Sequence, residues 1–166
     1  MKPARRASIA IETNAGTFTA HYSERGLAEL DFPSGKPDKL KPATPVTSEI
    51  RQWHTLTTKA VKAILAGRTP IQLPPLDVTR GTEFQQRVWE ELLWIPCGET
   101  RSYGEVAKNI RKPNAVRAVG GACGANPIPL LIPCHRVLAA NRKIGGFSGG
   151  LEWKKTLLAT EGVAVS

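Results

Sequence analysis

The chain has 166 residues, a formal net charge of +9, 41% hydrophobic residues and three cysteines. This length suits one ordinary domain or two small ones sharing an interface, and the apolar content argues against disorder. No apolar run reaches the ~18 residues that a membrane span needs, and the basic start lacks the apolar core of a signal peptide. An odd number of cysteines is no disulfide framework and fits a reducing compartment. We therefore expect a protein of the cytoplasm, or of the nucleus in a eukaryote, with no membrane partner.

The first half predicts a small antiparallel sheet with one helix. Residues 8–32 hold three segments with alternating apolar side chains, separated by turn residues, which is typical of a meander. Four prolines over 33–46 predict a loop, and an apolar stripe over 47–66, stopped by Gly67, predicts an amphipathic helix. We interpret His21 and His54 as surface or packing residues rather than ligands.

The proline-rich segment 68–81 predicts a connection between two domains. We place an N-terminal α/β domain over 1–76 and a C-terminal domain over 77–166. Thr82 and Gln85 have the spacing of a capping box, which opens a predicted helix whose apolar residues recur up to Pro96. The fold class is thus α/β (α+β), with a small antiparallel sheet-plus-helix domain followed by a mostly helical one.

Two short helices separated by a tight turn follow, which indicates a helix-turn-helix. Ser102 and Glu105 form a second capping box, Pro113 ends the first helix, and Asn114 is placed to cap the next. Five of the six charged residues between 101 and 117 are basic, which suits a phosphate backbone.

The second of these helices carries paired glycines, Gly120 and Gly121. Each costs roughly 0.8–1 kcal/mol relative to alanine inside a helix, so a compensating reason is expected. Apart from Arg117 the helix offers small side chains, which suits close approach to the minor groove without base readout. Tight packing between two helices would favour the same glycines, and both interpretations stay open.

The segment LIPCHRVLAA (residues 131–140) places Cys134, His135 and Arg136 in consecutive positions after a proline. Cysteine attacks as a thiolate, and a nearby imidazole can take the thiol proton and stabilise the anion. Adjacent side chains usually point apart, so contact between Cys134 and His135 needs a bend or an intervening water. Glu161 near the C-terminus is a candidate for the group that orients the histidine.

Other interpretations of Cys134 stay open at this point. A zinc site would need paired spacing such as CxxC, which the gaps between Cys97, Cys123 and Cys134 do not offer. A redox thiol lacks its CxxC partner, and a cysteine protease would not explain a helix-turn-helix. Packing of a buried thiol remains an alternative for Cys134, and we prefer it for Cys97 and Cys123.

Several segments resemble the O6-alkylguanine-DNA alkyltransferases, also called methylated-DNA–protein-cysteine methyltransferases. The segment NPIPLLIPCHRV, followed by GGFSGGLEWKKTLLATEG, is similar to the active-site region of that family. The segments RGTEFQQRVWEELLWIPCGETRSYGEVA and PNAVRAVGGACGANP resemble the family's preceding segments in the same order. The likeness is specific over residues 80–162 and weak before them.

The resemblance implies DNA repair by direct, single-turnover transfer of the alkyl group from O6-alkylguanine, with O4-alkylthymine left open. Cys134 would accept the alkyl group and keep it as a thioether. His135 would act as base through a water, and Glu161 would complete the relay. Asn126 would brace the turn before the cysteine strand. Tyr103 would stand near the rotated phosphate and hydrogen-bond the flipped base.

The resemblance also assigns residues to the DNA and to the flipped base. Arg117 would fill the gap left by the flipped nucleotide, which must leave the duplex because its alkylated atom is otherwise inaccessible. Further DNA contacts would come from Ala115, Gly120 and Gly121. Arg136 would support the loop. The residues that would line the pocket are Pro129, Val137, Phe147, Ser148 and Gly149.

No cofactor is implied, because the DNA itself donates the alkyl group. No metal is expected, since the first half lacks the cysteines of zinc-carrying relatives. The expected partner is double-stranded DNA with alkylated bases, bound by a monomer, and cooperative assembly on DNA stays open. The alternative function is a non-catalytic, lesion-sensing DNA-binding protein. A thiol enzyme acting on small molecules would leave the basic helix-turn-helix unexplained.

Overall fold

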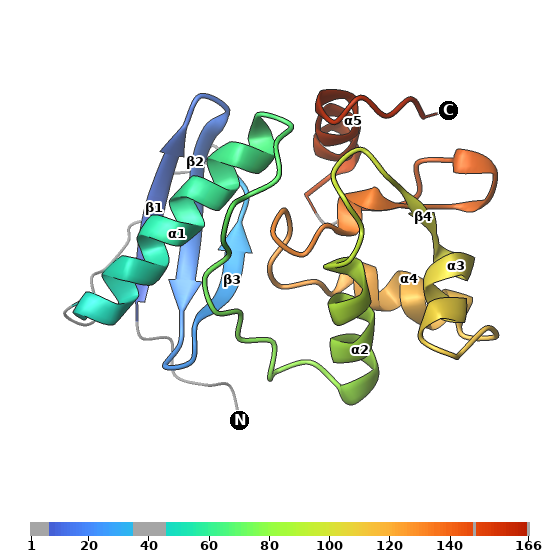
Figure 1. Cartoon of the computed structure of the whole chain (residues 1–166), viewed down its shortest axis with the longest axis horizontal. Helices are drawn as coiled ribbons and strands as arrows, with labels where there is room; N and C mark the ends of the chain where they lie inside the picture. The colour runs from blue at the N-terminus through green and yellow to red at the C-terminus, as the bar shows by residue number, and fades with distance from the viewer. Residues whose placement is uncertain (1–6, 35–45, 148, 166) are drawn as a thin grey trace.

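The structure is a computed structural model that describes residues 7–34, 46–147 and 149–165. A sheet with one helix lies beside a mostly helical half, and the two are joined by the segment that leads into α2 (Figure 1). Within the described ranges, no helix combines the length and the apolar character needed to cross a membrane.

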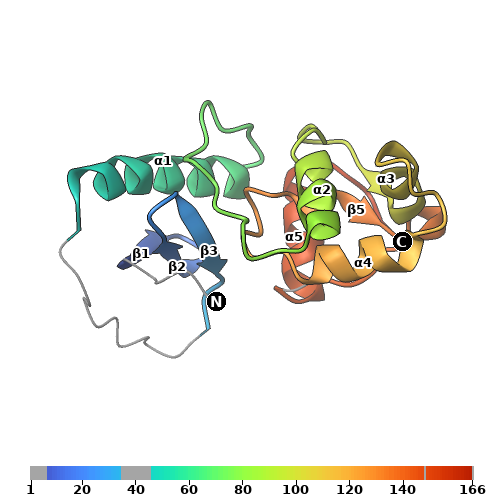
Figure 2. The same ribbon diagram turned by 90° about the horizontal axis from the view of Figure 1, so that it is seen from below.

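The N-terminal half is an antiparallel sheet of β1 (Ala7–Thr13), β2 (Gly16–Tyr22) and β3 (Leu27–Asp31), in that order. This confirms the predicted meander. Alternation places Tyr22 on the face covered by α1 (Ser48–Leu65), where its hydroxyl contacts His54 Nδ1 at 2.8 Å. Figure 2 shows α1 lying along this face of the sheet.

The C-terminal half begins with α2 (Glu83–Leu92), followed by β4 (Arg101–Ser102), α3 (Tyr103–Asn109) and α4 (Val116–Gly124). A 3-10 turn (Cys134–Arg136) leads into β5 (Val137–Leu138), which pairs with β4 in parallel. A second 3-10 turn (Ala140–Arg142) precedes α5 (Leu151–Thr160). The mostly helical half and its helix-turn-helix, α3 and α4, are as predicted.

Both predicted capping boxes are present. Thr82 Oγ1 accepts from Gln85 N at 3.1 Å, and Gln85 Oε1 accepts from Thr82 N at 2.9 Å. Ser102 and Glu105 exchange the same pair of bonds at the start of α3. These motifs are predictable because both partners lie within one turn of chain.

Two predicted helix boundaries are wrong. The first helix of this half ends at Leu92 rather than near Pro96, because Trp94 N and Ile95 N donate to carbonyls three residues back in a tighter turn. Asn114 does not cap α4: the N-cap is Ala115, with no side-chain cap bond. The chain is still turning there, since Ala115 N donates to Lys112 O, so α4 begins one residue too late for Asn114.

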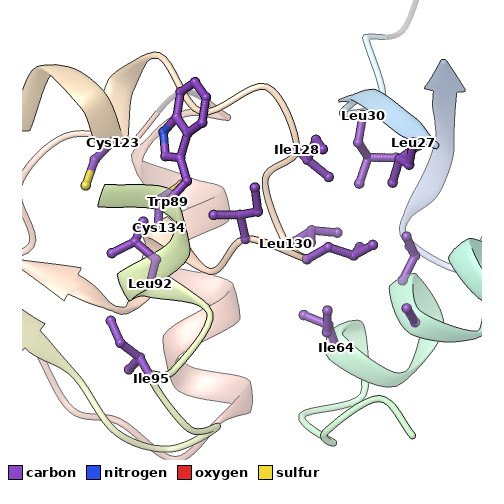
Figure 3. Close-up of a cluster of buried hydrophobic side chains, with 14 of the residues drawn as sticks. Leu27, Leu30, Ile64, Trp89, Leu92, Ile95, Cys123, Ile128, Leu130 and Cys134 are labelled. Atoms are coloured by element: carbon purple, nitrogen blue, oxygen red, sulfur yellow. The ribbon is translucent and has the colours of Figure 1, made fainter. Parts of the chain in front are cut away.

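The two halves share buried apolar contacts. Figure 3 shows Ile128 and Leu130, on the loop before Cys134, lying between Leu92 and Leu30, with Ile64 of α1 below Leu130. A backbone bond from Leu30 N to Pro127 O, 2.9 Å long, ties β3 to the same loop. The domain boundary at residue 77 stays a prediction.

Candidate active site

The thiol of Cys134 is held by a tight turn centred on Pro133. Pro133 has φ −80° and ψ 63°, the conformation of an inverse γ-turn, and Cys134 N donates to Ile132 O at 2.8 Å. The proline ring restricts φ to this region, so the sequence itself favours the bend. Cys134 is only 3% exposed at the start of the 3-10 turn.

Asn126 braces the loop that precedes the turn. Its Oδ1 accepts from Ile128 N at 2.9 Å, and its Nδ2 donates to Ile132 O at 2.8 Å, so one buried amide joins both ends of the loop. Leu130 between them has φ +72°, an unusual conformation for a buried leucine. These two hydrogen bonds are what the resemblance implied for Asn126.

His135, Glu161 and Arg136 form a buried hydrogen-bonded group. His135 Nε2 lies 3.0 Å from Glu161 Oε1, and Arg136 donates to both Glu161 oxygens, from Nη2 at 2.7 Å and Nε at 3.0 Å. Arg136 Nη1 also donates to Ile95 O at 2.7 Å, which fixes the guanidinium on the segment after α2. Arg136 therefore supports the loop and also binds the carboxylate that orients the histidine.

The partners of His135 define its tautomer. Glu161, when ionised, only accepts hydrogen bonds, so Nε2 of a neutral His135 carries the ring proton. Nδ1 then presents a lone pair; it is buried and has no hydrogen-bond partner among the described residues. The free lone pair on Nδ1 is what a base needs in order to accept a proton.

The charges of this group follow from burial and pairing. Burial alone would raise the pKa of Glu161, but His135 and Arg136 outweigh it and lower that pKa to about 2. Burial lowers the pKa of His135 and keeps the ring neutral, although Glu161 partly opposes this. Burial raises the pKa of Cys134 to about 11, although Asn126 and Lys154 oppose it, so the resting thiol is protonated.

Lys154 is a site residue that the sequence reasoning missed. Its amine is fully buried and donates to Val137 O at 2.7 Å and Gly146 O at 3.0 Å. Burial lowers its pKa to about 8, and the nearby thiols Cys134 and Cys123 oppose that shift. Lys154 occupies the same α5 face as Leu157, Leu158 and Glu161, and this helical spacing was the available signal.

Two of the predicted pocket residues, Tyr103 and Phe147, lie near Lys154 and His135, and the pocket assignment stays a prediction. The Tyr103 ring centre lies 6.0 Å from Lys154 Nζ, and burial raises the Tyr103 pKa to about 12, so its hydroxyl stays a donor. The Phe147 ring lies 6.4 Å from the His135 ring. Pro129 and Val137 are buried. Ser148 lies outside the described residues.

The predicted DNA face of α4 is exposed and smooth. Arg117 and Gly121 are exposed, while Ala115 and Gly120 are half-buried. A side-chain carbon added at Gly120 or Gly121 would meet no atom of the described residues within 4 Å, apart from the helix's own backbone. The alternative that tight helix packing requires these glycines is therefore wrong, and close approach of another molecule remains.

The other cysteines and histidines hold structural positions. Cys123 is buried as expected, and Cys97 is half-buried, with its thiol 3.3 Å from Gly67 O. His21 lies with Glu29 and Asp31 in a group whose ligand atoms are within 4.8 Å of one another. Both ring nitrogens of His21 already have partners, Ser8 at 2.6 Å and Asp31 at 2.7 Å, so we retain the packing interpretation. The absence of a metal stays a prediction.

The site combines a protonated thiol with a neutral imidazole that a carboxylate holds, and the same half of the chain carries a basic helix-turn-helix. These features are those of a protein with a cysteine nucleophile and a nucleic-acid interface. A family model described as the DNA-binding domain of 6-O-methylguanine DNA methyltransferase matches residues 83–163. The methylated-DNA–protein-cysteine methyltransferase of Methanosarcina acetivorans is 42% identical over 155 residues, covering 92% of this chain and 96% of that protein. That of Methanosarcina mazei is 56% identical over 142 residues, covering 83% and 85%.

Among solved structures, Mycobacterium tuberculosis OGT in complex with DNA aligns with a TM-score of 0.73 at 38% identity, covering 92% of this chain and 90% of that one. The chain therefore belongs to the methylated-DNA–protein-cysteine methyltransferases. This confirms the resemblance read from the sequence, and the alternative of a non-catalytic lesion sensor is not favoured.

Proposed function

We propose that the protein repairs O6-alkylguanine in double-stranded DNA by moving the alkyl group to Cys134 in a single turnover. The observation that carries this is the buried thiol placed directly before an imidazole whose Nε2 is held by Glu161 and whose Nδ1 is unpaired. We also infer that it acts as a monomer in the cytoplasm, which its three free cysteines suit.

The reaction is a displacement at the alkyl carbon. The thiol proton passes to His135 Nδ1 through a water, and Glu161 stabilises the resulting imidazolium. Cys134 Sγ then forms a bond to the alkyl carbon as the bond from that carbon to O6 breaks. The electron pair of the broken bond stays on the guanine, which takes up a proton from the Tyr103 hydroxyl. The tyrosinate then regains a proton from water, and the imidazolium of His135 gives one up to water. The thioether is stable, so each molecule reacts once.

The high pKa of the resting thiol suits a protein that reacts once. A thiol with a pKa near 11 is almost entirely protonated at neutral pH and is a poor nucleophile toward other electrophiles. Deprotonation of Cys134 then depends on proton transfer to His135 through the water. This transfer takes place when a flipped base fills the pocket.

Intact-protein and peptide mass spectrometry after incubation with duplex DNA containing O6-methylguanine tests the proposal. We expect one adduct per protein, heavier by one methylene, on Cys134, with loss of an equal amount of lesion. Cys134→Ser is the matched control and should bind the same DNA without modification. Binding by the wild-type protein without any adduct would contradict the chemistry and leave a lesion-sensing protein.

Arg117→Ala should slow repair in duplex DNA by about 10- to 100-fold, because unstacking a base costs a few kcal/mol and each 1.4 kcal/mol is a factor of ten. The reaction with the free base O6-benzylguanine needs no flipping and should keep its rate. Lys112→Ala, another exposed cation of the helix-turn-helix, is the control and should weaken binding to any DNA alike. If Arg117→Ala slowed the reactions with duplex DNA and with the free base equally, Arg117 would not be the residue that fills the gap left by the flipped nucleotide.

A further inference from the structure

We propose that Phe32, from the N-terminal half, is a positioning residue for the alkyl pocket: it holds Phe147 against the ring of His135. The inference rests on the proposed function, since it assigns a role within the same site. It also gives the N-terminal half a part in the chemistry, exerted through Phe147.

The rings form a continuous row from the sheet to the catalytic histidine. Phe32 lies 5.6 Å from Phe147 at an interplanar angle of 79°, and Phe147 lies 6.4 Å from His135 at 81°. Both are edge-to-face arrangements, which favour one relative orientation of the rings. Phe32 is the sheet residue in this row, since it follows β3 directly.

The segment that carries Phe147 is in close contact with Phe32. A side-chain carbon added at Gly149 would lie 2.6 Å from Phe32 Cε2 and 2.9 Å from Phe147 Cε1, so any larger residue there would have to displace one of the two rings. On its other side, Phe32 packs on Trp153 of α5 with ring centres 5.1 Å apart. The ring of Phe32 is therefore packed between the segment that carries Phe147 and Gly149 and α5, the helix that leads to Glu161.

The backbone next to Phe32 is fixed as well. Leu30 N, two residues earlier, donates to Pro127 O at 2.9 Å, beside the Asn126 brace. Phe18 of β2 packs against Phe32 from within the sheet, at 5.4 Å. Phe32 thus has a firm base on the sheet, whereas Phe147 lies on an irregular segment with no helix or strand of its own.

Loss of the Phe32 ring leaves Phe147 without its support while the DNA-binding helices α3 and α4 stay unchanged. The reaction rate at Cys134 should then fall although affinity for DNA is retained, because the variant affects the geometry of the bound base and not the phosphate contacts. If Phe32 had a purely structural role, loss of its ring would lower the stability of the protein without lowering the reaction rate at Cys134.

The test compares Phe32→Ala with Ile11→Ala, which truncates a buried side chain of β1 at the opposite edge of the same sheet. Rate constants are measured with free O6-benzylguanine and with duplex O6-methylguanine, well below each variant's Tm, and DNA affinity is measured in the Cys134→Ser background. We expect Phe32→Ala to react at least tenfold more slowly with both substrates at unchanged DNA affinity. Ile11→Ala should lower Tm but keep the rate, and Phe32→Tyr, which keeps the ring, should restore it.

Equal rates for Phe32→Ala and the wild-type protein, or an equal slowing by Ile11→Ala, would overturn the proposal. If Phe32→Ala does not fold, Phe32→Leu, Phe147→Leu and the double variant replace it. If the loss in rate constant of the double variant differs from the sum of the two single losses, expressed as free energies, the two rings are coupled. Additive losses would overturn the proposal. A wild-type protein that reacts with neither substrate would refute the proposed function itself, a result distinct from any of these.

Discussion

Arg136→Met should lower the free energy of unfolding by about 3–5 kcal/mol, because removing one partner leaves a buried charge uncompensated. The Arg136 and Glu161 side chains are 8% and 1% exposed, and Arg136 donates to both carboxylate oxygens. Methionine fills similar space but offers no donor. Glu161 must then either stay ionised with only His135 as partner or take up a proton. Denaturant unfolding at neutral pH measures the loss.

The matched control is Arg101→Met. Arg101 also faces a glutamate, Glu99, but at 3.7 Å and with both side chains partly exposed. Exposed pairs of this kind contribute about 0–1 kcal/mol. A loss of similar size in the two variants would mean that burial does not set the strength of the Arg136–Glu161 pair.

Glu161→Gln should slow alkyl transfer by roughly 10²–10⁴-fold, the usual contribution of a general base, because the variant disables His135 in that role. The amide is close in shape to the carboxylate, but it carries no charge to stabilise an imidazolium at His135. It can also turn its NH₂ group toward Nε2, which would favour the tautomer with the proton on Nδ1. Single-turnover kinetics with free O6-benzylguanine isolates this step from DNA binding. A rate within a factor of two of wild type would remove Glu161 from the relay.

The same variant has a pH signature in stability. The pKa of Glu161 is lowered from its ordinary value of 4.5 to about 2 in the folded protein, so the unfolded chain takes up the proton first. The stability contributed by the ionised group is complete above pH 4.5 and is lost as the pH falls toward 2. The wild-type protein should therefore lose stability over this range, and Glu161→Gln should lack that part of the loss.

Local signals in the sequence predicted the elements that depend on neighbouring residues. The capping boxes at Thr82 and Ser102 and the end of α1 before Gly67 each rest on contacts within one turn. Cys134 and His135 are neighbours in the sequence, and Glu161 was a candidate for the group that orients the histidine, but 26 residues separate the histidine from this carboxylate. Nothing in the spacing alone places them in contact.

What the sequence could not predict depends on contacts between distant segments. The hydrogen bonds of Lys154 to two pocket carbonyls, and the position of Phe32 beside Phe147, arise only when the sheet, the loop before Cys134 and α5 pack together. The wrong boundaries at Leu92 and Asn114 have a different cause. At both places backbone amides donate to carbonyls three residues back in tight turns, where the helical pattern predicted helix hydrogen bonds.

The bonds that fix β3 also occupy the outer edge of this strand. An edge strand with free amides invites pairing with another chain and hence aggregation. On β3, Leu27 N donates to Pro75 O, Leu27 O accepts from Asp77 N, and Leu30 N donates to Pro127 O. The connecting segment and the loop before the nucleophile thus cover the β3 edge of the sheet, and the backbone bond from Leu30 to that loop leaves β3 fewer free amides for pairing with another chain.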